Sequence, residues 1–232
     1  MSESLELYYE ELWTANYPKW ERGEITPAVM IAGETVPVDY CLTTISIIYK
    51  QNENILPKIN ELLFKLTEVA PNQFRYPLNS LHITMLGCTQ RQQDKLFFSK
   101  ERVNKIQDIC NSVLSGSGPV LFDVKGVGIL GNQIYLQVYP RNNKWKEKRE
   151  VLEAKLLESN ETPICFANKV PIHINIMRIT DPDKNQIVPL LKEICALHNK
   201  YIGSFEVINI DFLITDFVLS ERNAIFLSSI NL

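Results

Sequence analysis

The sequence predicts an α+β fold of two similar lobes, and three observations lead to this expectation. Two short stretches, 80–87 and 171–178, alternate apolar and polar residues with a period of two, as half-buried strands do. Several longer stretches carry apolar residues at helical spacing. The order strand, helix, histidine-containing strand, helix occurs in both halves of the chain. We therefore expect a duplicated unit, in which each lobe is an antiparallel sheet backed by helices.

Residues 1–37 differ from the rest of the chain because they are acidic and rich in aromatic residues. A short amphipathic helix followed by an irregular stretch is expected where apolar residues recur at helical spacing, at Leu5, Tyr8, Tyr9 and Leu12. Aromatic rings bury a large apolar area, so this arm is expected to pack on the remaining domain, residues 38–232. The alternative is a lid over the functional site.

The elements of the two halves follow in a fixed order. The first half continues with a β-branched strand (41–49), an amphipathic helix (55–69), a loop (72–79), a histidine-containing strand (81–87) and a second helix (100–114). The second half has a hairpin (120–139), a helix (144–159), the second histidine-containing strand (171–178), a helix (184–198) and two long strands (210–219 and 224–232). The mixed charge of 144–159 is interpreted as a solvated helix face.

The two histidine-containing strands carry the same pattern. His82 and Thr84 share one face of the first strand, and His173 and Asn175 share one face of the second. The chain has only three histidines, and two of them sit in these matched positions. A single histidine in an apolar strand is more often structural than catalytic, but a matched pair favours a shared function.

This pair resembles the twin His-x-Thr/Ser-x motifs of the two-histidine (2H) phosphoesterase superfamily, which includes 2′-5′ RNA ligase-like proteins and cyclic nucleotide phosphodiesterases. The resemblance covers residues 38–232 and includes Gly126-Val127-Gly128, which is similar to the start of the family's middle hairpin. It implies the bilobal LigT-like fold, with two antiparallel sheets around a central cleft and one catalytic histidine from each lobe. Asn175 departs from the family pattern, which usually has Thr or Ser.

The resemblance implies roles for individual residues. His82 and His173 would be the general acid and base, and Thr84 and Asn175 would bind the phosphate. Tyr135 is a candidate for stacking on a base, with a packed or exposed strand tyrosine as the alternative. Arg178 lies five residues after His173, an odd offset that turns it to the opposite strand face, so it is interpreted as structural.

Composition narrows the classes of partner. The net charge of −3 gives no broad basic surface, which argues against duplex DNA and favours a nucleotide or short RNA-like substrate. The five cysteines show no C-x-x-C pair or other zinc-type spacing, so reduced cysteines, no metal and no cofactor are expected. No signal peptide or membrane-spanning run is apparent, so a cytoplasmic location is expected.

These expectations combine into a functional hypothesis. The sequence predicts a metal-independent phosphodiesterase that hydrolyses a cyclic phosphate or a short 2′,5′- or 3′-linked nucleotide. The alternative is a nucleotide- or RNA-binding module in which Asn175 marks the loss of efficient turnover. A scaffold that uses the aromatic arm to hold a partner is a third hypothesis. The exact substrate, the identity of the base and the oligomeric state stay open.

Overall fold

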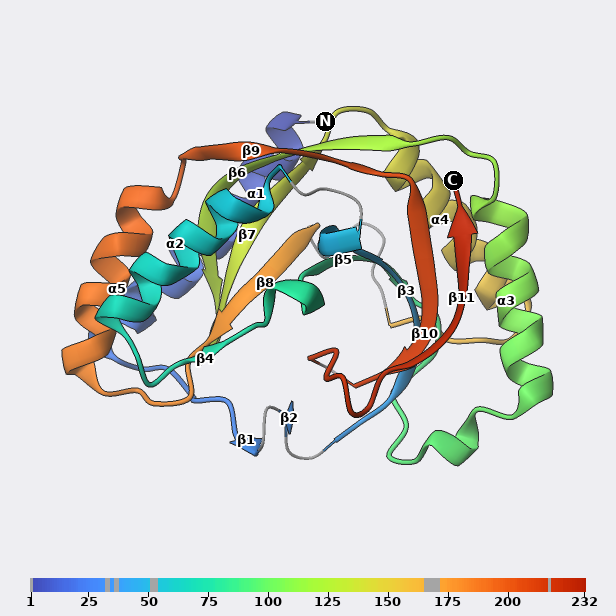
Figure 1. The fold of residues 1–232 in the computed structure, drawn as a ribbon, viewed down its shortest axis with the longest axis horizontal. Helices are drawn as coiled ribbons and strands as arrows, with labels where there is room; N and C mark the ends of the chain where they lie inside the picture. The colour runs from blue at the N-terminus through green and yellow to red at the C-terminus, as the bar shows by residue number, and fades with distance from the viewer. Residues whose placement is uncertain (1, 32–33, 36–37, 51–53, 165–171, 217) are drawn as a thin grey trace.

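The computed structural model describes residues 2–31, 34–35, 38–50, 54–164, 172–216 and 218–232. Two antiparallel sheets face one another across the middle of the molecule, with helices on the outside of each (Figure 1). A minor two-stranded sheet joins β1 (Met30–Ile31) to β2 (Glu34–Thr35). The predicted α+β architecture of two antiparallel sheets is therefore confirmed. Cys165, which the sequence suggested to be a reduced thiol, lies outside the described residues.

The first sheet has four strands in the order β11-β10-β3-β5. Their bounds are Cys41–Ile47 for β3, His82–Gly87 for β5, Asn209–Thr215 for β10 and Ile225–Asn231 for β11. The histidine-containing strand β5 lies at the sheet edge and pairs with the β-branched strand β3. Strand β10 ends at Thr215, so it is shorter than the predicted strand 210–219.

The second sheet has five strands in the order β4-β8-β7-β6-β9. Their bounds are Phe74–Arg75 for β4, Val120–Leu130 for β6, Gln133–Pro140 for β7, His173–Arg178 for β8 and Tyr201–Val207 for β9. The predicted hairpin is confirmed, since Leu130 pairs with Gln133 across the turn. The short strand β4, expected to be loop, and strand β9 were not predicted.

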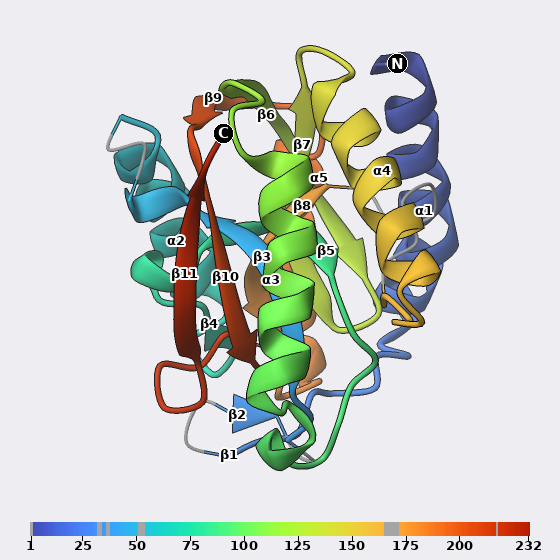
Figure 2. The ribbon, with the colours of Figure 1, turned by 90° about the vertical axis from the view of Figure 1, so that its right-hand side faces the viewer.

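Each sheet is backed by one helix from each half of the chain (Figures 1 and 2). Helices α2 (Leu56–Val69) and α5 (Lys184–Leu197) pack together behind the five-stranded sheet, where α2 contacts β9 and α5 contacts β6. Helices α3 (Lys100–Leu114) and α4 (Lys144–Glu158) pack together behind the four-stranded sheet, where α3 contacts β11 and α4 contacts β5. The two halves thus exchange a helix. The lobes do not correspond to consecutive segments of sequence.

The first helix, α1 (Ser2–Arg22), is 21 residues long, so the prediction of a short helix was wrong. It continues through Pro18 and packs along β6, β7 and α5. Tyr9 and Trp20 are both 1% exposed, which explains why this segment can be rich in aromatic residues. The chain then passes through a short 3-10 turn, η1 (Ile48–Lys50), on its way from β3 to α2. No helix among the described residues is long and apolar enough to cross a bilayer.

Candidate active site

The two histidine-containing strands have the same local structure. In β5, His82 and Thr84 are partly exposed while the residues between and after them are buried. In β8, His173 and Asn175 are partly exposed and their neighbours are buried in the same sequence of positions. The alternation predicted from the sequence is confirmed, because each strand turns its apolar face into the core and its polar pair outward.

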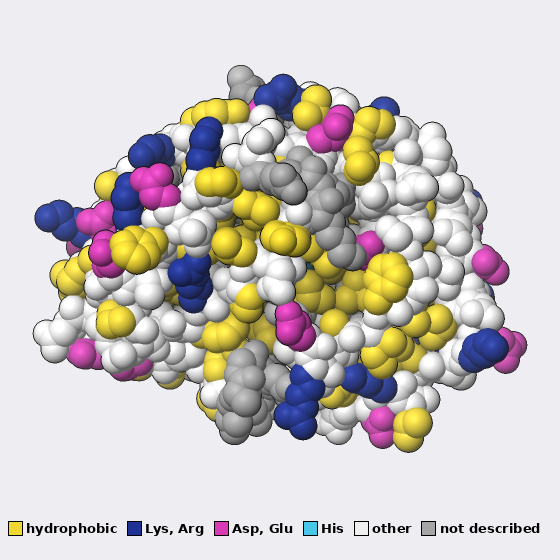
Figure 3. Space-filling model, in the orientation of Figure 1, with side chains coloured by type: hydrophobic (Ala, Val, Ile, Leu, Met, Phe, Trp, Pro, Cys, Tyr) yellow, Lys and Arg dark blue, Asp and Glu magenta, His cyan; other side chains and the backbone are white. Residues whose placement is uncertain are grey.

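These two polar faces meet in one pocket of about 320 Å³, which His82, Thr84, His173 and Asn175 all line. Strands β5 and β8 contact one another, so the pocket lies where the two sheets approach. Figure 3 shows apolar side chains gathered towards the middle of one face of the molecule, with charged residues mainly around them. The fold therefore brings together the four residues that the sequence singled out.

The hydrogen bond of His82 determines which of its ring nitrogens carries a proton. Nδ1 lies 2.8 Å from the backbone carbonyl of Ser80, and a carbonyl oxygen can only accept. Nδ1 is therefore the donor, and Nε2 carries the free lone pair when the ring is neutral. Burial lowers the pKa of His82, and the bond to Ser80 partly opposes this effect. The neutral form is favoured at neutral pH, which suits a proton acceptor.

His173 lies at the start of β8, where it pairs with Gln137 of β7. The ring of Tyr135 contacts it edge to face, with ring centroids 5.5 Å apart. Tyr135 is only 2% exposed and lies against Gly128, where an added Cβ would come within 2.4 Å of the tyrosine ring. No face of this ring is open to a base, so the suggested stacking role is wrong in this structure. Tyr135 is instead a packed strand tyrosine that contacts His173.

Asn175 lies beside Tyr135 in the ladder between β7 and β8. Its side-chain oxygen is buried and accepts no hydrogen bond from the described residues. Thr215 at the end of β10 also lines the pocket, is 5% exposed, and has a hydroxyl without a partner among those residues. Buried polar groups are normally hydrogen-bonded, so these two atoms mark the pocket as a place for polar ligand groups.

Arg178 lies away from the pocket, as the strand parity predicted. Its Nε donates to the hydroxyl of Tyr76 at 2.6 Å, and its NH1 donates to the Asn132 side chain at 3.2 Å. The arginine therefore holds the β6–β7 turn to the segment before β5, and its interpretation as a structural residue is supported by these contacts.

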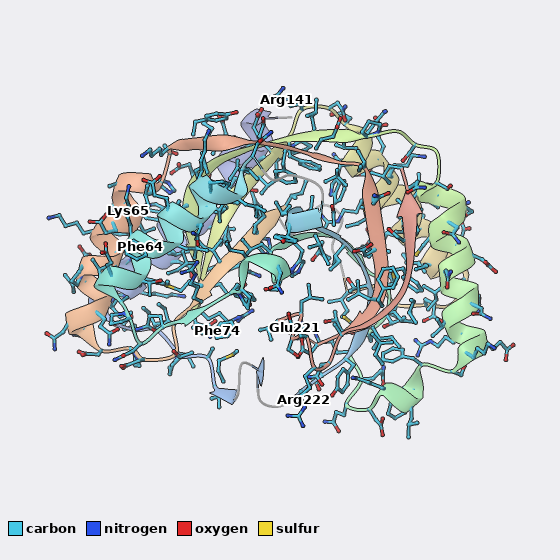
Figure 4. All side chains as sticks on the ribbon, in the orientation of Figure 1. Phe64, Lys65, Phe74, Arg141, Glu221 and Arg222 are labelled. Carbon is cyan, nitrogen blue, oxygen red and sulfur yellow. The ribbon has the colours of Figure 1, made fainter. Side chains whose placement is uncertain are left out.

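The loop after β10, of which the structure describes Asp216 and residues 218–224, forms one wall of the pocket through Asp216 and Leu219. The Asp216 carboxylate organises this loop by accepting four hydrogen bonds, from Val218 N, Ser220 N, Ser220 Oγ and Asn223 Nδ2. Glu221 of this loop accepts a hydrogen bond of 2.8 Å from Asn79, in the short 3-10 helix η2 (Leu78–Ser80) that leads into β5. Figure 4 shows Glu221 and Arg222 at this end of the β10–β11 connection.

His198 belongs to another part of the molecule. Its Nε2 lies 3.0 Å from a carboxylate oxygen of Glu10, its Nδ1 lies 3.2 Å from the carbonyl of Val127, and its ring stacks on Trp13. It joins the end of α5 to α1, which agrees with the absence of any catalytic assignment from the sequence.

Several solved structures are similar to this fold. The crystal structure of TT0787 of Thermus thermophilus matches with a TM-score of 0.57 at 13% sequence identity, over 83% of this chain and 97% of that chain. Escherichia coli LigT complexed with 3′-AMP matches with a TM-score of 0.55 at 14% identity, over 84% of this chain and 98% of that chain. A crystal structure of a phosphoesterase matches with a TM-score of 0.54 at 14% identity over the same shares. This chain has the LigT-like fold. The resemblance to the two-histidine phosphoesterases is thereby confirmed at the level of the fold. No protein-family model and no curated protein sequence matches the chain.

Within this LigT-like fold the pocket has residues that the sequence analysis missed. Arg149 of α4 lines the pocket although it is only 4% exposed, and Arg91 and Gln133 line it as well. The solvated face predicted for this helix does not include Arg149, which lies on the opposite, buried face. The signal was present, because Arg149 stands on the buried stripe formed by Trp145, Leu152 and Leu156 at helical spacing. No group of three or more His, Cys, Asp or Glu residues within the described part of the chain is arranged to hold a metal ion.

Proposed function

We propose that this protein is a metal-independent phosphodiesterase that hydrolyses a cyclic phosphate or a short 2′,5′- or 3′-linked nucleotide. The observation that supports this proposal is the shared pocket lined by His82, Thr84, His173 and Asn175. Two imidazoles and two small hydrogen-bonding groups from different sheets form a constellation suited to acid–base attack on a phosphodiester.

His82 is the general base in this proposal. Its Nδ1 is committed to the Ser80 carbonyl, so Nε2 is the atom that takes the proton from the attacking water. His173 is the general acid and gives its proton to the departing oxygen. Each such transfer typically contributes about 10²–10⁴-fold in rate.

The phosphate is held by donors from both sheets. The Thr84 hydroxyl and the Asn175 side-chain nitrogen would donate to the non-bridging oxygens, where charge builds in the transition state. Losing one such donor typically costs about 10²–10³-fold in rate. Arg149 contributes a fixed positive charge to the same pocket wall, and a guanidinium suits planar contact with phosphate oxygens.

Two further observations support a nucleotide as the substrate. The pocket volume of about 320 Å³ lies in the range of about 300–1,000 Å³ that small-molecule sites occupy. LigT, which shares the fold, has been solved in complexes with 3′-AMP and with ATP.

The test is hydrolysis in the presence of EDTA of 2′,3′-cyclic mononucleotides, 2′,5′-linked oligoadenylate and short RNAs that end in a cyclic phosphate. His82→Ala and His173→Ala are each expected to lower kcat by about 10²-fold or more. His198→Gln is the matched control, because it removes the third imidazole without touching the pocket, and it should retain activity within a few-fold.

Turnover that EDTA leaves intact and that either histidine substitution abolishes would support the proposal. Turnover that survives both substitutions would contradict it. Protection against thermal unfolding by a nucleotide without any hydrolysis would instead support a binding module, and a gain of activity in Asn175→Thr would then identify Asn175 as its cause.

A further inference from the structure

The hydroxyl of Tyr9 enters the end of the ladder between β7 and β8. It accepts a hydrogen bond of 3.1 Å from the backbone N–H of Val138. It also lies within hydrogen-bonding distance of the carbonyls of Val138 and Ile172, to which its single proton can be donated. The last paired residues of this ladder are Gln137 and His173. The helix α1 therefore contacts the backbone immediately before the candidate general acid.

Aromatic packing makes a second connection between the same groups. The ring of Tyr9 lies 6.1 Å from the ring of Tyr135, and the ring of Tyr135 lies 5.5 Å from that of His173. Tyr9 is 1% exposed, and burial raises its pKa well above the usual value, so its hydroxyl stays protonated as a donor. The Tyr9 side chain thus contacts both the backbone directly before β8 and the ring of Tyr135, which packs on His173.

The far end of α1 is fixed to the same sheet. Trp20 donates from its indole nitrogen to the carbonyl of Gly131 at 2.9 Å, and Asn16 accepts from the N–H of Gly131 at 3.0 Å. Gly131 forms the β6–β7 turn, next to Leu130, which lines the pocket. The helix is therefore a rigid support from which Tyr9 reaches the start of β8.

We propose that Tyr9 is a positioning residue for His173, acting through the Ile172 carbonyl and the Tyr135 ring. A catalytic group must be held within about 0.5 Å of its productive place, and a misplacement of about 1 Å can cost about 10²-fold in rate. The Tyr9 hydroxyl contacts the carbonyl of Ile172, the residue directly before His173, and the N–H of Val138 on the neighbouring strand. The kinetic part of this inference rests on the proposed function, whereas the placement of the ring does not.

The experiment compares Tyr9→Phe with wild-type protein by NMR of the three histidine side chains. Tyr9→Phe keeps the ring and its packing and removes only the hydroxyl. Tyr201→Phe is the matched control, because it removes an exposed hydroxyl from strand β9 of the same sheet, where it contacts Asp123. His82 reports on the other sheet, and His198 reports on the docking of α1 through Glu10 and Trp13.

We expect Tyr9→Phe to shift the ring resonances of His173 while those of His82 and His198 stay in place. Tyr201→Phe should move none of them. Unchanged His173 signals in Tyr9→Phe would overturn the inference. Equal changes at His198 would overturn it as well, since they would show that the whole helix had detached. These readouts need no substrate, so they stay informative if the proposed hydrolysis is not found.

Where hydrolysis is found, Tyr9→Phe is expected to lower kcat by about tenfold with a change in KM of less than about threefold, because the substrate contacts are left in place. A fall in kcat/KM caused by KM alone would contradict a role in positioning the acid.

Discussion

The carboxylate of Asp216 is predicted to hold the loop wall of the pocket, and Asp216→Asn tests this directly. Both carboxylate oxygens are used: Oδ1 accepts from Val218 N and Ser220 N, and Oδ2 accepts from Ser220 Oγ and Asn223 Nδ2. The amide is nearly the same size but replaces one oxygen with a donor. With the amide nitrogen in the place of Oδ2, the Ser220 hydroxyl can turn to accept from it, but the bond from Asn223 Nδ2 is lost, so at least one of the four bonds must be lost. The side chain is 4% exposed, so water cannot easily replace a lost bond.

The expected loss follows from this bond. A hydrogen bond to a charged group contributes about 1.5–3 kcal/mol, so Asp216→Asn should lower the free energy of unfolding by about 1.5–3 kcal/mol. Urea unfolding followed by tryptophan fluorescence measures this value. Glu221→Gln is the control in the same loop, where an exposed hydrogen bond to Asn79 is altered, and it should change stability by less than about 0.5 kcal/mol.

A second readout concerns the pocket. Asp216 and Leu219 line it, so loosening the loop should weaken nucleotide binding in addition to lowering stability. If Asp216→Asn unfolds within about 0.5 kcal/mol of the wild type, the carboxylate is not the organiser of this loop and the reasoning fails.

Three further predictions concern the pocket itself. Because burial lowers the pKa of His82, the acid limb of the pH profile of kcat/KM should have a midpoint below the usual histidine pKa of about 6.5. The stability that neutral His82 contributes should likewise be lost as pH falls below about 6.5. An acid limb with a midpoint above about 6.5 would argue against His82 as the base. Arg149→Met, which keeps the apolar stem, should weaken inorganic phosphate or nucleotide binding by about tenfold in calorimetry, and unchanged affinity would remove Arg149 from the site. Tyr135→Phe should leave unfolding stability unchanged or raise it, because the hydroxyl is buried without a partner among the described residues, and a loss above about 1 kcal/mol would reveal a hydrogen bond that this geometry lacks.

The histidine-containing strands could be predicted from sequence because their information is local. Alternation with a period of two fixes which residues share a face, and this was sufficient to place His82 with Thr84 and His173 with Asn175. Helix α3 was predicted with its observed ends, since Ser99 caps its first turn and a Gly-Ser stretch follows its last.

The remainder depends on contacts between distant segments. Pro18 usually ends or kinks a helix, yet α1 continues past it because Trp20 is buried against the β6–β7 turn. Helical spacing puts Arg149 on the buried face of α4, but it lines the pocket because α4 packs behind β5, and that contact between distant segments is not written in the local pattern. The ring of Tyr135 is closed off by Tyr9, more than a hundred residues away in the chain.

The exchange of helices between the two halves has a consequence for how the pocket comes into being. A fragment that ends in the turn near Gly116 would contain β3, α2 and β5, but α2 would lack α5 and β5 would lack α4. In the complementary fragment, α5 would lack α2 and α4 would lack β5. Neither could bury its apolar faces alone, so a split chain should regain structure only when both pieces are mixed. Folding of the intact chain must likewise wait for contacts between distant segments, which slows it. We therefore expect the two imidazoles to become neighbours late, once both halves of the polypeptide are complete.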